Sequence, residues 1–143
     1  MDEKLSQLYD GLIWEHSRSP HFFEKRSEAQ YVIEASNPLC GDKFKLFLDV
    51  NKDGLITAAT FYGYGCVVSK ASSSVLMTKI QGQPLDSLPD ILKRFLDAVV
   101  AGPARLSTDP ELDSFAVAKN FPGRDKCATL AWEALMNWKN DLI

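Results

Sequence analysis

The sequence has few cysteines, few histidines and no long apolar run. Among its 143 residues there are three cysteines and two histidines. No apolar segment approaches the roughly 20 residues that a membrane-spanning helix needs. The first residues, Met1 to Lys4, are mostly charged and no apolar segment follows them, which argues against a secretory signal peptide. We therefore expect a cytoplasmic protein that does not enter a membrane.

Clusters of positive charge are also missing. The net charge is −3, and lysine and arginine are scattered along the chain, so the electrostatic signature of a nucleic-acid-binding protein is absent. Three cysteines are too few, and odd in number, for a disulfide scaffold. In a reducing compartment they are free thiols, metal ligands or catalytic groups. The length predicts one domain, over residues 1–143, with a single hydrophobic core.

The hydrophobic pattern predicts an α+β fold. Residues 43–50 alternate between apolar and polar side chains, as a half-buried strand does, and Asn51 to Gly54 is typical of a hairpin turn. Gly63 and Gly65 are expected to end the third strand. Residues 101–123 are expected to form an irregular connection, with a short helix near 110–118. The predicted elements are strands over 31–36, 43–50 and 55–62 in an antiparallel sheet, and helices over 3–17, 66–80, 84–100 and from about 124.

Each cysteine lies at the boundary of a predicted element. Cys40 lies in the loop between the first two strands, Cys66 begins a helix, and Cys127 lies in the first turn of the last helix. Helix N-termini carry partial positive charge and unpaired N–H groups, which favour thiolate over thiol. Thiolate is the form that binds metals and attacks sulfur. These positions favour a chemical role for the three cysteines.

A purely structural role is the alternative for each cysteine. Free cysteine is often buried and only fills space, and Cys127 falls on the apolar stripe of its helix. Asp42, two residues after Cys40, is either a solvated turn residue or an oxygen ligand for the same ion. Three thiolates and one carboxylate would suit zinc, or iron bound with sulfide. The cysteine spacing matches no compact zinc motif, so only the fold could assemble such a site.

Other chemistry finds little support in the sequence. His16 lies on the apolar stripe of the first helix and is interpreted as a structural residue, and His21 as a solvated loop residue. We find no grouping of serine, histidine and aspartate and no phosphate-binding glycine loop.

Four segments resemble the U-type iron–sulfur cluster assembly proteins, a family that includes the IscU and SufU types and the N-terminal domain of NifU. They are LYDGLIWEHSRSP (8–20), NPLCGD (37–42), FYGYGCVVSKASSSVL (61–76) and RDKCATLAWEAL (124–135). The resemblance implies helices packed on a three-stranded antiparallel sheet. It also implies a metal site made of Cys40, Asp42, Cys66 and Cys127.

Departures from the family pattern indicate the SufU-type branch. Lys126 stands where the IscU type has a histidine, and residues 102–123 resemble an insertion of the SufU type. Arg124 matches an arginine of that branch, and we expect it to lie near the site and tune thiolate charge. Members of this branch resemble zinc-dependent acceptors of persulfide sulfur from a cysteine desulfurase, whereas IscU-type members resemble scaffolds for a [2Fe–2S] cluster. Both types serve downstream iron–sulfur assembly proteins.

Cys40 is our first candidate for the sulfur acceptor, because Gly41 beside it would allow the loop to move, and Cys127 is the second. Two other functions stay open. One is a zinc-stabilised structural or adaptor domain without sulfur transfer. The other is a thiol-based redox sensor, which would form a reversible disulfide and bind no metal.

Overall fold

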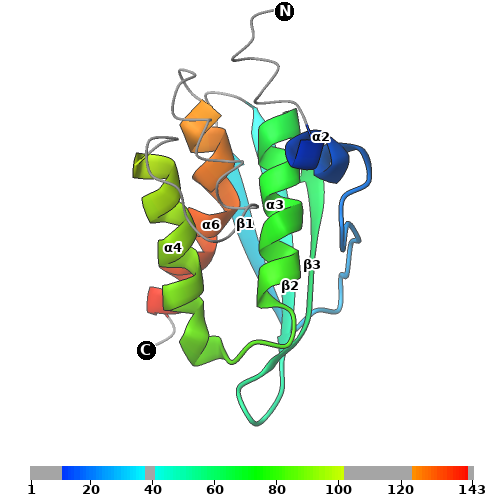
Figure 1. Ribbon diagram of the computed structural model, residues 1–143. Coiled ribbons are helices and arrows are strands. Elements are labelled where there is room, and N and C mark those ends of the chain that lie inside the picture. The colour runs from blue at the N-terminus through cyan, green and yellow to red at the C-terminus, as the bar shows by residue number, and fades with distance from the viewer. Residues whose placement is uncertain (1–10, 38–40, 102–123, 142–143) are drawn as a thin grey trace, which may run out of the picture.

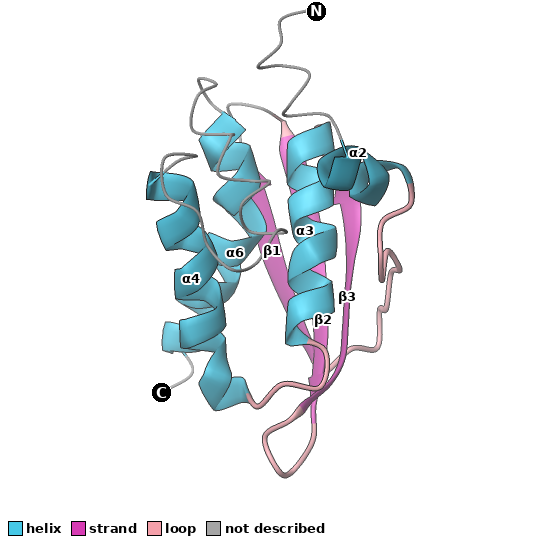
Figure 2. Cartoon of the chain, in the orientation of Figure 1, coloured by secondary structure: helices cyan, strands magenta, loops and turns pink. Residues whose placement is uncertain are grey.

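The computed structural model describes residues 11–37, 41–101 and 124–141, and it has a three-stranded sheet with helices on one face (Figures 1 and 2). The strands are β1 (Tyr31–Asn37), β2 (Asp42–Val50) and β3 (Ile56–Tyr64). Their order in the sheet is β1-β2-β3, and both neighbouring pairs are antiparallel. The predicted α+β class is therefore confirmed.

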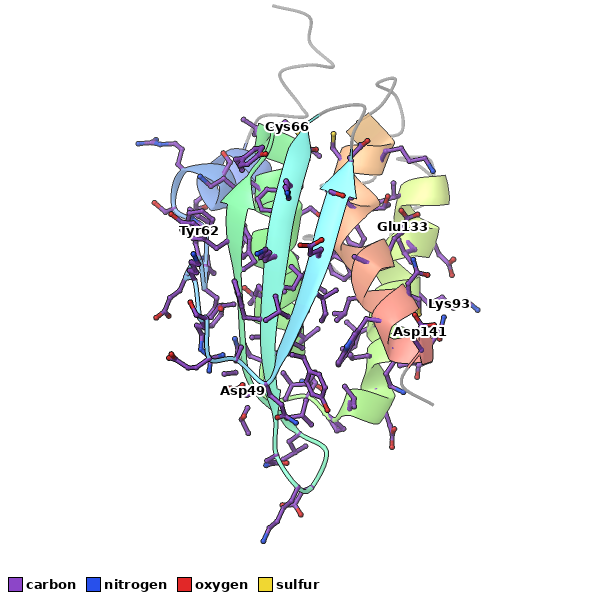
Figure 3. The ribbon with its side chains drawn as sticks, turned by 180° about the vertical axis from the view of Figure 1, so that it is seen from behind. Asp49, Tyr62, Cys66, Lys93, Glu133 and Asp141 are labelled. Atoms are coloured by element: carbon purple, nitrogen blue, oxygen red, sulfur yellow. The ribbon has the colours of Figure 1, made fainter. Side chains whose placement is uncertain are left out.

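Strand β2 shows why the sheet has a covered face. Phe44 and Leu46 in the core alternate with the exposed Lys43 and Lys45, although Phe47, whose side chain points to the other face, is buried as well. This alternation is typical of an antiparallel sheet with one face on the core. Figure 3 views the molecule from behind, with the strands in front of the helices.

The described helices are α2 (Gly11–Arg18), α3 (Val67–Ile80), α4 (Leu88–Ala101) and α6 (Arg124–Asp141), with a short 3-10 turn, η1 (Leu85–Ser87), before α4. Helix α3 packs against β3, α2 and α6, and α6 packs against α4 and β1. The rings of Phe95 and Trp132 stack between α4 and α6 with their centroids 3.8 Å apart. None of the described helices is long and apolar enough to span a membrane.

The sequence prediction for Gly63 was wrong, because β3 continues through this residue to Tyr64. Gly63 has a φ of 146°, and a Cβ atom there would overlap the carbonyl oxygen of Lys43 on β2. Glycine is needed here because two backbones approach closely, and the strand is not interrupted. Since Lys43 pairs with Tyr64, the continued strand brings Cys66 beside Asp42 at the start of β2.

Smaller differences concern the helices. The predicted helix over residues 84–100 begins with the 3-10 turn η1, so the α-helix starts only at Leu88. Helix α2 matches the second half of the predicted helix over residues 3–17 and ends one residue later, at Arg18. Residues 3–10 of that prediction, and the short helix expected near 110–118, lie outside the described residues.

Candidate metal centre

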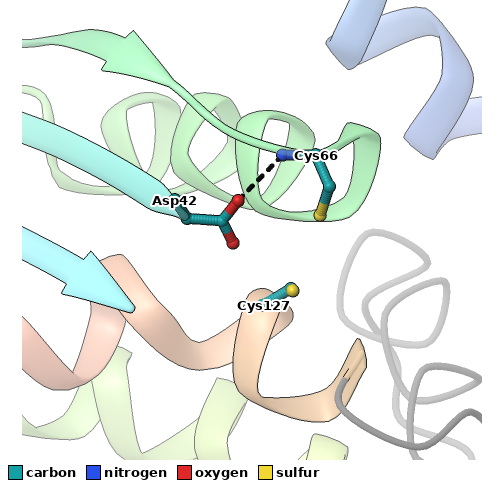
Figure 4. A group of neighbouring side chains, drawn as sticks. All are labelled: Asp42, Cys66 and Cys127. Atoms are coloured by element: carbon teal, nitrogen blue, oxygen red, sulfur yellow. Dashed lines mark hydrogen bonds between the residues drawn. The ribbon is translucent and has the colours of Figure 1, made fainter. Parts of the chain in front are cut away.

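Three side chains from three elements meet at one end of the sheet (Figure 4). Asp42 is the first residue of β2, Cys66 immediately precedes α3, and Cys127 lies in the first turn of α6. One carboxylate oxygen and the two sulfur atoms all lie within 4.8 Å of one another. The sulfurs of Cys66 and Cys127 point toward each other from the two helices (Figure 4). The fold thus brings together three residues that are far apart in the sequence.

Cys66 is the N-cap residue of α3. Its backbone is extended, with φ −75° and ψ 172°, and its sulfur accepts a hydrogen bond from the backbone N–H of Ser69 at 3.4 Å. A cap of this kind satisfies one of the unpaired N–H groups of the first helical turn. It also fixes the direction of the sulfur, which is held beside the positive end of the helix dipole.

Asp42 completes this cap from the neighbouring strand. Its Oδ1 atom accepts a hydrogen bond from the backbone N–H of Cys66 at 3.0 Å. In many helices a glutamate three residues into the helix takes that N–H, but here Ser69 occupies that position and the carboxylate comes from β2. Asp42 is only 3% exposed, so the interpretation as a solvated turn residue was wrong.

The second oxygen of Asp42 is the least expected atom of the group. Oδ2 is buried and has no hydrogen-bond partner within the described part of the chain. An unpartnered buried carboxylate oxygen is costly, because it has lost its water without gaining a donor. A cation held between Asp42, Cys66 and Cys127 would compensate this cost. The donor set present here therefore fits a metal ion.

The thiol of Cys66 is acidic. Its pKa falls from an ordinary value of 9.0 to about 5, chiefly because the side chain of Cys127 donates a hydrogen bond to it. Hydrogen bonds from the backbone and hydroxyl of Ser69 lower the pKa further, whereas burial and the nearby charge of Asp42 raise it. This lowered pKa favours the thiolate, the form that binds a metal.

Cys127 belongs both to this group and to the hydrophobic core. It is 1% exposed and lies one turn before Ala131 and Trp132, which are also buried. The indole N–H of Trp132 donates to the hydroxyl of Ser72 on α3 at 2.8 Å, and that hydroxyl donates to the carbonyl of Ala128. These bonds connect α6 to α3 just beyond Cys127.

Three of the four predicted ligands are thus close together, and the fourth, Cys40, lies outside the described residues. The residue after it, Gly41, has a φ of 74°, and its N–H donates to the carbonyl of Asn37 at 2.9 Å. Arg124 begins α6, but its side chain also lies outside the described part.

The two histidines do not belong to the described group. His16 is buried, with its Nδ1 atom 2.7 Å from the hydroxyl of Ser74, and the ring of His21 packs against it at 4.8 Å. The structural interpretation of His16 is confirmed. Sequence reasoning missed Ser69, because the usual capping pattern has glutamate or glutamine three residues after the cap, and a serine there gives no such signal.

Known proteins with related sequences are iron–sulfur assembly proteins. The chain is 31% identical to the zinc-dependent sulfurtransferase SufU of Bacillus subtilis over 132 residues, which cover 92% of this chain and 88% of SufU. It is 30% identical to the iron–sulfur cluster assembly scaffold protein IscU of Thermotoga maritima over 131 residues, covering 90% of this chain and 89% of IscU.

A solved structure from Fervidobacterium islandicum, named as a candidate iron–sulfur cluster assembly scaffold protein for the SUF system, has a similar fold. The TM-score is 0.80 at 27% identity, with 92% of this chain and 96% of that chain covered. Residues 8–137 match the NifU-like N-terminal domain family. This match includes Asp42, Cys66 and Cys127, and the chain belongs to that family.

Proposed function

We propose that the protein acts in iron–sulfur cluster biogenesis, as a zinc- or iron-binding acceptor or scaffold for sulfur. The observation that carries this proposal is the group of Asp42, Cys66 and Cys127, with a buried carboxylate oxygen that has no donor in the described structure. Relatives named as a zinc-dependent sulfurtransferase and as assembly scaffolds support it. Zinc is the proposed resident ion, and a [2Fe–2S] cluster would be cargo built at the same residues.

Cys40 is the proposed fourth ligand and the proposed sulfur acceptor, with Cys127 as the second candidate. The thiolate of the acceptor would attack the terminal sulfur of a persulfide on a cysteine desulfurase. A new S–S bond forms on the acceptor, the old S–S bond breaks, and the desulfurase cysteine leaves as a thiolate. Bound zinc would keep the ligand sulfurs deprotonated and protect them from oxidation.

One feature of this chain suits a site that must release what it holds. Asp42 provides a carboxylate, a harder ligand than thiolate and a weaker one for soft metal ions. Cys127 is 1% exposed and fixed in the core, which favours Cys40 over Cys127 as the sulfur acceptor. We further propose that Arg124 lies near the site and tunes the charge of the thiolates. We also propose that residues 1–143 form one domain. The protein would work in the cytoplasm, with a cysteine desulfurase and downstream assembly proteins as partners.

Anaerobic purification followed by metal and sulfide analysis tests the metal centre. We expect about one zinc ion per chain, or iron with sulfide, bound through these residues. A protein without bound metal that forms a reversible disulfide would instead be a redox sensor.

Sulfur transfer is tested with a cysteine desulfurase, its substrate cysteine and the single variants C40A, C66A and C127A. We expect the wild type to raise desulfurase turnover and to become persulfidated, and C40A to accept no sulfur. Full sulfur acceptance by C40A would exclude Cys40 as the acceptor. A protein that keeps zinc but leaves turnover unchanged would be an adaptor domain.

A further inference from the structure

Ser69 contacts the sulfur of Cys66 through both its backbone and its side chain. We propose that Ser69 is a positioning residue of the metal centre, which holds this sulfur toward Asp42 and Cys127 and takes up part of its negative charge when it binds a cation. This inference rests on the proposed metal-binding function and adds a residue outside the proposed ligand set. The argument depends on two hydrogen bonds and on the packing that holds the serine in place.

The backbone contact fixes the direction of the sulfur. The N–H of Ser69 donates to Sγ of Cys66 at 3.4 Å. Because Ser69 is the third residue of α3, its N–H has no carbonyl partner earlier in the helix and is free to serve the cap. Any rotation of the Cys66 side chain away from Cys127 would break this bond and leave the N–H buried without an acceptor.

The hydroxyl of Ser69 can also donate a hydrogen bond to the sulfur of Cys66. Its Oγ atom accepts from the thiol of Cys66 at 3.5 Å, and its proton goes to the carbonyl oxygen of Cys66 at 3.2 Å. That carbonyl also accepts the N–H of Lys70 at 3.0 Å, so it keeps a donor if the hydroxyl turns away. A hydroxyl can rotate to donate wherever an acceptor needs it. The hydroxyl proton of Ser69 can therefore be donated to the sulfur of Cys66 when that sulfur is a thiolate.

The surrounding residues leave the hydroxyl little choice of position. Ser69 is 1% exposed. A Cβ atom added at Gly65 would lie 2.5 Å from Oγ of Ser69 and 2.7 Å from the ring of Phe44. Only a residue without a side chain fits between strand and helix at this point, and the space that glycine leaves is filled by the serine hydroxyl. Gly65 and Phe44 thus keep Oγ next to the cysteine.

Hydrogen bonds to a metal-bound thiolate have measurable effects. They stabilise the sulfur lone pairs and orient the ligand, and loss of such an outer partner typically lowers metal affinity about 10–100-fold. The N–H of Ser69 donates to the sulfur of Cys66, and the Ser69 hydroxyl lies within reach of the same sulfur. Since Asp42 also holds the backbone N–H of Cys66, the ligand is oriented before a cation arrives. Removal of the Ser69 hydroxyl alone should lower the metal affinity by an amount near the lower limit of this range.

Cobalt(II), used in place of zinc in the full-length protein, provides the test. We expect S69A to move the sulfur-to-cobalt charge-transfer absorption to longer wavelength, because the sulfur lone pairs rise in energy. We also expect its zinc affinity, measured by competition with a chromophoric chelator, to fall about tenfold. S69T, which keeps the hydroxyl, should retain the wild-type absorption. Alanine is a good helix former, so metal-free S69A should fold as the wild type does.

S73A is the matched control. Ser73 is buried on the same helix, and its hydroxyl donates to the carbonyl of Ser69 at 2.9 Å and not to a sulfur. We expect S73A to leave the cobalt spectrum unchanged. Equal spectra and zinc affinities for S69A and S73A would overturn the inference, as would a shift in S69T equal to that in S69A or a metal-free S69A that does not fold. A wild-type protein that binds neither metal would overturn the proposed function itself.

Discussion

Two aspartates at opposite ends of β2 have opposite environments. Asp49, at the hairpin end (Figure 3), accepts the backbone N–H of Gln30 at 2.8 Å through Oδ1 and pairs with Arg26 through Oδ2. Asp42, at the other end, is more deeply buried, yet its Oδ2 has no donor in the described structure. The same residue type on one strand is fully partnered where it holds the segment before β1 and under-partnered where the thiols gather. This difference indicates that Asp42 is kept for a ligand.

Replacing Asp42 with asparagine should give the largest effect. D42N keeps an oxygen for the N–H of Cys66 but loses the charge that faces the two sulfurs. We expect zinc affinity to fall more than about 100-fold, since loss of outer partners alone costs about 10–100-fold. The free energy of unfolding of the metal-free protein should not decrease, because a buried charge is removed. Chelator competition and urea unfolding measure the two quantities, and a D42N variant with wild-type zinc affinity would contradict the assignment.

The two ends also differ in what their glycines permit. At Gly63, a Cβ atom would overlap the Lys43 carbonyl and lie 2.8 Å from Cα of Phe44, whereas at Gly54 in the hairpin turn it would meet nothing within 4 Å. We expect G63A to lower the free energy of unfolding by about 3 kcal/mol or more, through backbone displacement and a strained φ. G54A should cost only about 1 kcal/mol, for its positive φ. If G63A and G54A lost similar amounts of unfolding free energy in urea, the close approach of the two backbones at Gly63 would not explain why glycine is required there.

The two ends of β2 should contribute to the stability of the metal-free protein over different pH ranges. The pKa of Cys66 is lowered from 9.0 to about 5, so its thiolate stabilises the fold fully above the unfolded pKa, and this contribution falls as the pH drops from about 9 to 5. The pKa of Asp49 lies below 3.8, chiefly because Gln30 donates to it, and its contribution is lost only at lower pH. Urea unfolding across this pH range should show a slope between pH 9 and 5 that C66S removes and D49N retains.

D49N should give the smallest effect. Asp49 is partly exposed, and exposed charge pairs contribute about 1 kcal/mol or less. We expect D49N to lower the free energy of unfolding by about 1 kcal/mol, through the weakened bonds to Gln30 and Arg26. Zinc affinity should stay at the wild-type value. A loss of metal binding in D49N would show that the two ends are not independent.

Much of the fold could be predicted because local patterns and tertiary structure agree. The alternation of Phe44, Leu46 and Leu48 with lysines specified a half-buried strand, and Asn51 to Gly54 specified its turn. Gly63 was misread because a glycine in a strand can mark either an interruption or a close contact between backbones. Only the partner strand, with the carbonyl of Lys43 beside it, decides between the two.

The site was predictable in its residue types but not in its details. The positions of Cys66 and Cys127 at helix starts indicated acidic thiols, and for Cys66 the lowered pKa is confirmed. The main cause is a bond from Cys127, a residue 61 positions later, and no local pattern contains that information. The burial of Asp42 and the contact of Ser69 with a sulfur likewise depend on how β2, β3 and α3 meet.

The three grouped side chains come from parts of the chain that are far apart in the sequence. A cation bound to all three would therefore act as a removable cross-link, closing long loops as a disulfide does and reducing the entropy of the unfolded chain. Because such an ion binds only the folded arrangement, raising its concentration would increase the resistance of the described fold to heat and proteases. Delivery of the ion or its cargo would then remove this cross-link and lower the stability of the fold that joins β2, α3 and α6.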